Sequence, residues 1–176
     1  MMHHKIVIAN SKMANNGKST SIRYVFEILS SRYPYLVIEP ASGYNPTQDV
    51  EAIVEIPQSD SHIVKVGIES LGDPGYARPS KSIEEFLAAG CEIILMACRT
   101  KGDTIAEVGK LRNNKWQVIW FDNSTMWVDS ANNRIDASGT SLDKQDERIQ
   151  DQLSRDYGFY VASLIERLVL KEGELF

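Results

Sequence analysis

Short apolar blocks alternate with amphipathic segments along most of the chain. Six of the blocks have the length and the aliphatic or aromatic content of β-strands, and most are continuous apolar runs, as a sheet covered on both faces requires. They are KIVIA (5–9), YLVIEP (35–40), EAIVEI (51–56), HIVKVGIES (62–70), CEIILMAC (91–98) and QVIWFD (117–122). The pattern therefore predicts six strands.

Helical patterns separate several of these strands. After Gly17, apolar residues recur at helical spacing on one face. The segment SKSIEEFLAAG (80–90) begins with a Ser/Glu capping pattern and stops at a glycine, and DTIAEVGKLRNN (103–114) predicts a further helix. This alternation predicts a three-layer α/β fold with a mostly parallel sheet.

One pair of strands and the C-terminal part depart from this alternation. A polar turn joins 51–56 directly to 62–70, so we expect a hairpin and one antiparallel strand at the sheet edge. A polar segment at about 127–144 predicts a mobile loop, and a C-terminal helix follows at about 144–172. The helix residues expected to cover the core are Ile149, Leu153, Tyr157, Tyr160, Val161, Leu164 and Leu168.

The composition limits the classes of function. At 176 residues and 43% hydrophobic content, the chain is expected to form a single domain over 1–176. A net charge of -5 and an isoelectric point near 5.2 make direct nucleic-acid recognition unexpected. No apolar run reaches the roughly 18 residues that a membrane span needs, and Cys91 and Cys98 have neither zinc nor disulfide spacing. We therefore expect a cytoplasmic protein.

The sequence GKST follows the first predicted strand and opens the first predicted helix. A bound phosphate needs converging backbone N–H groups, a helix N-terminus and a nearby cation, and this junction offers all three. Gly17 allows close approach of the backbone, and Lys18 can reach the outer phosphate oxygens. Ser19 can hold Mg²⁺, and Thr20 can donate to the inner phosphate.

The match to the phosphate-loop pattern G-x-x-x-x-G-K-[ST] is imperfect, because Lys12 stands at the place of the first glycine. Asn15 and Asn16 tolerate a positive φ angle better than other non-glycine residues, so the loop can still curl. The alternative interpretation is a polar turn that only caps a helix. The position of GKST between a buried-type strand and an amphipathic helix favours phosphate binding.

Carboxylates stand where a magnesium site would need them. Glu39 ends YLVIE and Glu69 ends IVKVGIE, and a turn-forming segment follows each of them. In P-loop proteins, the carboxyl ends of neighbouring strands face the metal and the attacking water. The alternative for each glutamate is simple solvation at a strand end.

These segments together resemble a known family. SKMANNGKST is similar to the deviant phosphate loop of ParA/MinD-type partition ATPases in the SIMIBI class, and LVIEPASGYN is similar to that family's strand-end acid and following segment. VKVGIESLGDPG resembles the family's Walker B strand and the turn after it. The resemblance covers 5–124 and implies a P-loop NTPase fold, Mg-ATP binding, slow hydrolysis and a nucleotide-dependent homodimer.

The resemblance also implies roles for individual residues. Lys12 is the candidate for the signature lysine that reaches the phosphates of the partner subunit, although it lies one residue farther from Gly17 than the family spacing would put it. Glu39 and Glu69 stand at the two acid positions, where the family has Asp. WFDNS resembles the place where the family reads the adenine ring, so Asp122 and Asn123 are candidate base contacts.

Three functions are compatible with these features. The first is an ATPase switch that cycles between nucleotide states to move, partition or assemble a protein partner of unknown identity. The second is a small-molecule or nucleotide kinase, whose acceptor phosphate would be neutralised by Arg78, Lys81, Arg99 and Lys101. The third is a nucleotide-binding module without hydrolysis. A kinase needs a lid with several arginines, whereas 127–144 holds only Arg134, so the switch is favoured.

Overall fold

The strands and helices of the computed structural model follow the predicted order. The structure describes residues 5–11, 18–39, 43–71, 78–98, 103–122 and 144–170. The strands are β1 (Ile6–Ser11), β2 (Tyr35–Glu39), β3 (Glu51–Ser59), β4 (His62–Glu69), β5 (Ile93–Cys98) and β6 (Gln117–Asp122). The helices are α1 (Lys18–Ser30), α2 (Arg78–Ala88), α3 (Asp103–Asn113) and α4 (Lys144–Leu170). All of the predicted strands and helices are confirmed, whereas almost all of the loop predicted at about 127–144 lies outside the described residues.

The strands form one sheet in the order β2-β3-β4-β5-β1-β6. β1 pairs in parallel with both β5 and β6, and β4 pairs in parallel with β5, whereas β3 is antiparallel to both of its neighbours. The predicted antiparallel strand is therefore confirmed, but its predicted place at the edge is wrong. The hairpin pairs only one side of β3 with β4. β2 pairs with the backbone groups on the other side of β3, and β2 therefore forms the edge.

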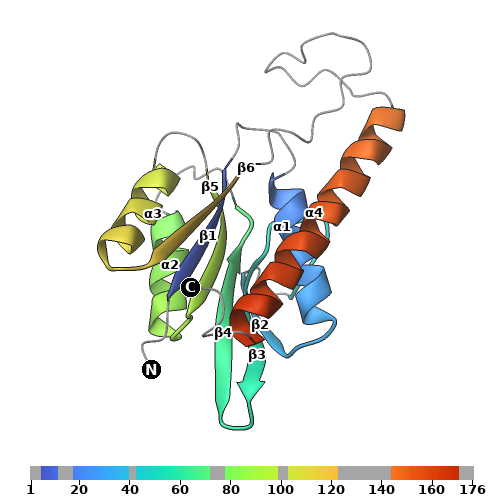
Figure 1. Ribbon diagram of the computed structural model, residues 1–176. Helices are drawn as coiled ribbons and strands as arrows, with labels where there is room; N and C mark the ends of the chain where they lie inside the picture. The colour runs from blue at the N-terminus through green and yellow to red at the C-terminus, as the bar shows by residue number, and fades with distance from the viewer. Residues whose placement is uncertain are drawn as a thin grey trace.

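Five of the six strands consequently end at the same edge of the sheet, which we call the carboxyl edge. Helices cover both faces, with α1 and α4 on one side and α2 and α3 on the other (Figure 1). Along β1, Ile6 and Ile8 belong to the core under α1 and α4, whereas Val7 and Ala9 belong to the core under α2 and α3. This two-sided burial explains the continuous apolar runs, and the three-layer α/β arrangement agrees with the prediction.

Helix α4 is 27 residues long and packs closely against α1 (Figure 1). Gly158 allows this approach, because a Cβ atom at that position would lie 2.6 Å from the Cβ of Tyr24. The Tyr24 hydroxyl donates a hydrogen bond to Asp151, and the guanidinium of Arg155 lies over the Tyr24 ring. Close packing and polar contacts therefore join α4 to the helix that begins with the GKST sequence.

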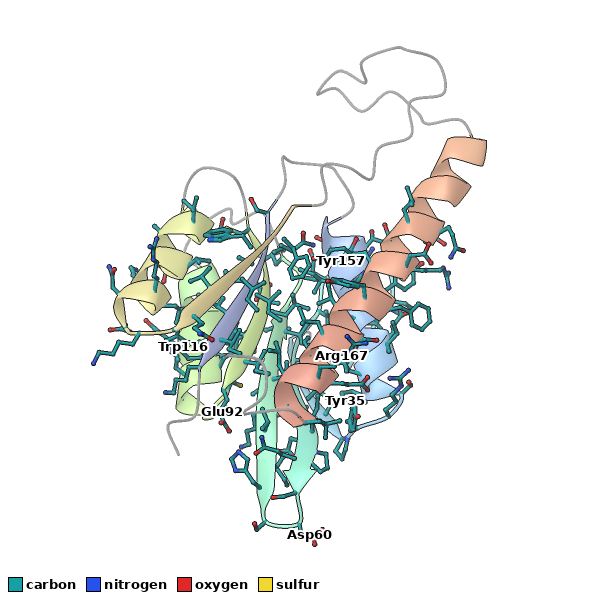
Figure 2. The ribbon with its side chains drawn as sticks, in the orientation of Figure 1. Tyr35, Asp60, Glu92, Trp116, Tyr157 and Arg167 are labelled. Carbon is teal, nitrogen blue, oxygen red and sulfur yellow. The ribbon has the colours of Figure 1, made fainter. Side chains whose placement is uncertain are left out.

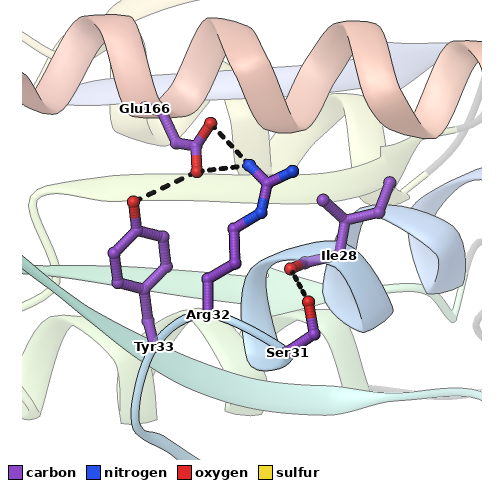
Figure 3. A network of polar contacts seen from close by, with 5 residues as sticks. All are labelled: Ile28, Ser31, Arg32, Tyr33 and Glu166. Atoms are coloured by element: carbon purple, nitrogen blue, oxygen red, sulfur yellow. Dashed lines mark hydrogen bonds and ion pairs between the residues drawn. The ribbon is translucent and has the colours of Figure 1, made fainter.

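A second set of polar contacts joins the end of α1 to α4. Arg32 donates to the two carboxylate oxygens of Glu166 at 2.8 and 3.0 Å, and the Tyr33 hydroxyl donates to the same carboxylate at 3.1 Å (Figure 3). The Ser31 hydroxyl donates to the carbonyl of Ile28 at 2.7 Å, which satisfies one of the last carbonyls of α1. Exposed ion pairs contribute only about 0.2–1 kcal/mol, so this cluster mainly fixes the register of the two helices.

Most of the apolar face predicted for the C-terminal helix is buried. It supplies the buried residues Tyr157, Val161 and Leu168 and the half-buried residues Leu153 and Leu164. Tyr157 points from α4 towards the sheet (Figure 2). The predicted burial of Tyr160 is wrong, because it lies at the border of this face, 63% exposed, with its ring 5.9 Å from that of Phe121. The side chain of Ile149 is outside the described part.

Neither α4 nor another described helix is long and apolar enough to cross a membrane.

Candidate functional site

Several polar residues meet at the carboxyl edge of the sheet. Ser11 of β1 is level with Asp122 of the neighbouring β6. Glu51, the first residue of β3, is level with Glu39 of β2 on one side and Glu69 of β4 on the other. The predicted strand-end residues therefore share one edge of the sheet, although the side chains of Glu39 and Asp122 lie outside the described part.

Helix α1 begins at this edge, and Ser19 in its first turn is tied to the sheet. The Ser19 hydroxyl donates to the backbone carbonyl of Ser70, the residue directly after β4, at 2.7 Å. This bond uses the hydroxyl proton and leaves the oxygen lone pairs available to a cation. The start of α1, where the first N–H groups have no partner within the helix and the dipole is positive, is thereby fixed beside the end of β4.

Ser70 is itself held firmly. It is completely buried, and its hydroxyl accepts a hydrogen bond from the backbone N–H of Val50 at 2.8 Å. The same hydroxyl donates to the carboxylate of Asp49 at 2.9 Å, and the Ser70 N–H donates to the Val50 carbonyl at 2.9 Å. Because its anchor is fixed by three further bonds, the position of Ser19 is preorganised.

Arg23 adds a positive charge near the start of α1, and the sequence analysis did not single it out. Its guanidinium donates to the Thr20 hydroxyl at 3.1 Å and to the backbone carbonyl of Gln48 at 3.3 Å. Thr20 accepts this bond and keeps its own proton for another acceptor, which is compatible with its predicted contact to a phosphate. The i, i+3 spacing of Thr20 and Arg23 on a predicted helix is the signal that could have found the pair.

Glu69 is a buried carboxyl group at the end of β4. Only 4% of the residue is exposed, and the backbone N–H of Leu71 donates to its Oε1 at 2.8 Å. Burial raises the pKa of Glu69 to about 7, and the negative charges of Glu51 and Asp49 add to the rise. Hydrogen bonds from Ser82 and Leu71 act in the opposite direction. Glu69 therefore changes its charge near neutral pH.

Glu69 and Ser19 approach the carboxyl edge from different faces of the sheet. Val66 and Ile68 of β4 belong to the core under α1 and α4, so Glu69 points to the opposite face, where it meets Ser82 of α2. Within the described part, Ser19 contacts the residue after Glu69, but the two side chains predicted to hold Mg²⁺ do not contact each other. A shared Mg²⁺ would reach one of them through a water ligand, as this ion commonly does.

Glu51 is a further buried acid that sequence reasoning missed. It is 6% exposed and is the direct partner of Glu69 in the antiparallel ladder. The signal was available, because a hairpin register places the first residue of one strand opposite the last residue of the other. Among the described residues, no group of three or more His, Cys, Asp or Glu side chains could hold a metal ion.

Asn10, near the end of β1, was also missed. It is completely buried, and in the described part of the chain neither its Nδ2 nor its Oδ1 has a hydrogen-bond partner. It follows the alternation of Ile6 and Ile8 and therefore faces α1 and α4, between Ala97 of β5 and Phe121 of β6. An unpaired buried amide costs about 1–3 kcal/mol and calls for an explanation.

The remaining predicted site residues lie outside the described part. They are Lys12, Asn15, Asn16, Gly17 and Asn123, together with the side chain of Lys18. Their roles in holding phosphate, in contacting a partner subunit and in binding the base stay predictions.

No protein-family model, curated protein or solved structure matches the chain. The resemblance to partition ATPases therefore stays a prediction from the sequence, and the geometry of the carboxyl edge is the independent ground for a functional proposal.

Proposed function

We propose that the chain is a P-loop ATPase of the switch type that binds Mg-ATP with its phosphates at the N-terminus of α1. The observation that carries this proposal is the bond from Ser19 to Ser70, which fixes the start of the GKST helix beside the buried Glu69. The first N–H groups of a helix lack partners within it, and together with the helix dipole they favour a bound anion.

The side chains at this edge suit magnesium. Mg²⁺ prefers oxygen ligands and usually combines one or two protein ligands with phosphate oxygens and waters. Ser19 offers its hydroxyl lone pairs, and Glu69 offers a carboxylate when it is ionised. A bound Mg²⁺ would neutralise charge on the outer phosphates. Lys18 would contact the same phosphates, and Arg23, anchored to Thr20, adds positive charge to the first turns of α1.

The switch proposal includes slow hydrolysis and a nucleotide-dependent homodimer in which Lys12 reaches the partner's phosphates. The kinase alternative rests on side chains that are mostly outside the described part. Its one described cation, Lys81, lies exposed on α2 and pairs with Glu85 at 3.5 Å. A bound base would lie near Asp122 at the end of β6, which borders β1.

Substitution of Lys18 tests the proposal. We expect Lys18→Ala to lower the affinity for Mg-ATP about ten- to hundredfold in a calorimetric titration, because a charge-assisted contact to phosphate is worth about 1.5–3 kcal/mol. The control is Lys110→Ala, in the last turn of α3, where the lysine pairs with Glu107 at 2.6 Å. Equal ATP binding by Lys18→Ala and the wild type would sink the phosphate-site proposal.

The same samples distinguish the three functions. With a slowly hydrolysed ATP analogue, a switch should shift from monomer to dimer in light scattering, and Lys12→Ala should weaken that shift while it retains nucleotide. Slow ADP release without an acceptor supports the switch. Unchanged mass together with many-fold stimulation by a nucleoside or nucleotide acceptor points to a kinase, and binding without ADP release points to a module without hydrolysis.

A further inference from the structure

We propose that Asn10 is a further ligand-contacting residue and that its side-chain amide binds the phosphate end of the nucleotide from beneath α1. The inference rests on the proposed function and adds a residue that lies outside the GKST sequence. Its starting point is the buried amide with two unpaired polar atoms described above.

The register of the sheet places Asn10 in line with the anchor of α1. Asn10 is level with Ala97 of β5, and Glu69 of β4 is level with Met96. Ser70, which follows Glu69, therefore continues the row that contains Ala97 and Asn10. Neighbouring strands lie about 4.8 Å apart, so Asn10 stands roughly 10 Å from the end of β4 along this row.

The start of α1 lies over the same row. Ser19 is bonded to Ser70 at one end of it, and Ile22 of the following turn packs in the core that contains Ala97. Asn10 faces this side of the sheet, as the alternation with Ile8 requires. An unpartnered and completely buried amide is thus directed to the side on which the helix N-terminus would hold an anion.

The chemistry of the carboxamide fits a hydrated phosphate. Its Nδ2 has two N–H donors, and hydrogen bonds from a donor to a charged phosphate oxygen are stronger than bonds between neutral groups. Its Oδ1 accepts from a water bound beside that phosphate. An apolar side chain would fill this core position without leaving unpaired atoms. The amide therefore needs a partner that the described residues do not supply, and a bound phosphate with its water would be such a partner.

Two substitutions at Asn10 test the inference. Asn10→Leu keeps the approximate size and removes both polar atoms, so the melting temperature without nucleotide should stay equal or rise. Its affinity for Mg-ATP in calorimetry should nevertheless fall about ten- to hundredfold, because a bond to a charged group is lost. Asn10→Asp keeps the shape but replaces the two N–H donors by a carboxyl group, which repels phosphate when it is ionised and offers a single donor when it is protonated, so its affinity should also fall.

Tyr157→Phe is the matched control. In the described part of the chain, the Tyr157 hydroxyl is also buried without a hydrogen-bond partner, but it belongs to α4, and its ring packs on Phe121 at the β6 end of the row that contains Asn10. Its removal should leave the melting temperature equal or higher and the affinity for Mg-ATP unchanged. This control separates the general effect of removing an unpaired buried group from the loss of a ligand contact.

The possible results are distinguishable. Lost affinity with an undiminished melting temperature supports the contact. Unchanged affinity in Asn10→Leu, or an affinity loss that only accompanies a lowered melting temperature in both Asn10 variants, overturns it. A wild type that binds no Mg-ATP contradicts the proposed function itself, whereas a wild type that binds it as tightly as Asn10→Leu contradicts only this inference.

Discussion

The buried carboxyl group of Glu69 makes the carboxyl edge sensitive to pH. The pKa of Glu69 rises from its ordinary value of 4.5 to about 7, chiefly because burial disfavours the charged form. Between these values the folded protein holds a proton that the unfolded chain has lost. The free energy of unfolding therefore decreases as the pH rises from 4.5 to about 7, on the order of 3 kcal/mol for a shift of this size.

Glu69→Gln should remove this dependence, because the amide stays neutral at every pH. We expect the free energy of unfolding of the variant, measured with urea, to be higher relative to the wild type at pH 8 than it is at pH 5. Glu84→Gln, at an exposed position of α2, is the control for the change in charge. A stability difference between Glu69→Gln and the wild type that is the same at both pH values would contradict the account.

With nucleotide, Glu69→Gln should also weaken the dependence of binding on Mg²⁺.

At this scale the sequence predicted the residues with a local signature and missed those with only a spatial one. Ser19 and Glu69 were singled out because GKST and a strand-end acid are visible in the chain itself. Asn10 has no motif around it, and only its burial without partners makes it conspicuous. Glu51 joins the candidate site only because it is paired with Glu69 in the sheet, and such pairing between strands has no local signature in the sequence.

At the scale of elements, hydrophobic periodicity predicted every strand and helix of the described part, because each must bury a face or a stripe. It did not predict which strand occupies the edge, since β2 reads as a short apolar run like its neighbours. It also assigned Tyr160 to the buried face of α4, although Tyr160 lies exposed at the border of that face, with its ring near Phe121 of β6. Position at a border depends on the partner element and not on spacing.

The contact between α1 and α4 yields a prediction that uses two helical glycines. Gly158→Ala should lower the free energy of unfolding by about 1–3 kcal/mol, because the added Cβ overlaps the side chain and backbone of Tyr24. Gly109→Ala on α3 is the matched substitution. Nothing lies within 4 Å of its Cβ, so the better helix propensity of alanine should raise stability by about 0.5–1 kcal/mol. Urea unfolding of both variants checks the opposite signs, and an equal effect of the two changes would contradict the packing.

At the scale of the whole molecule, the parallel strands and the start of α1 concentrate polar groups at one edge of the sheet. The hairpin turn at Asp60 lies at the opposite end of the molecule (Figure 2). Ligands of open α/β sheets bind at the carboxyl ends of the strands. We therefore propose that Mg-ATP binds at the carboxyl edge, under and around the first turn of α1.

Amide NMR spectra recorded during a titration with Mg-ATP test this claim most directly, because they report both binding and its location. The account predicts shifts of the backbone signals of Ser19, Thr20 and Ser70 and of the side-chain amide of Asn10, while Asp60 stays unchanged. Spectra that do not respond to Mg-ATP, or that respond only around the hairpin turn, would contradict it.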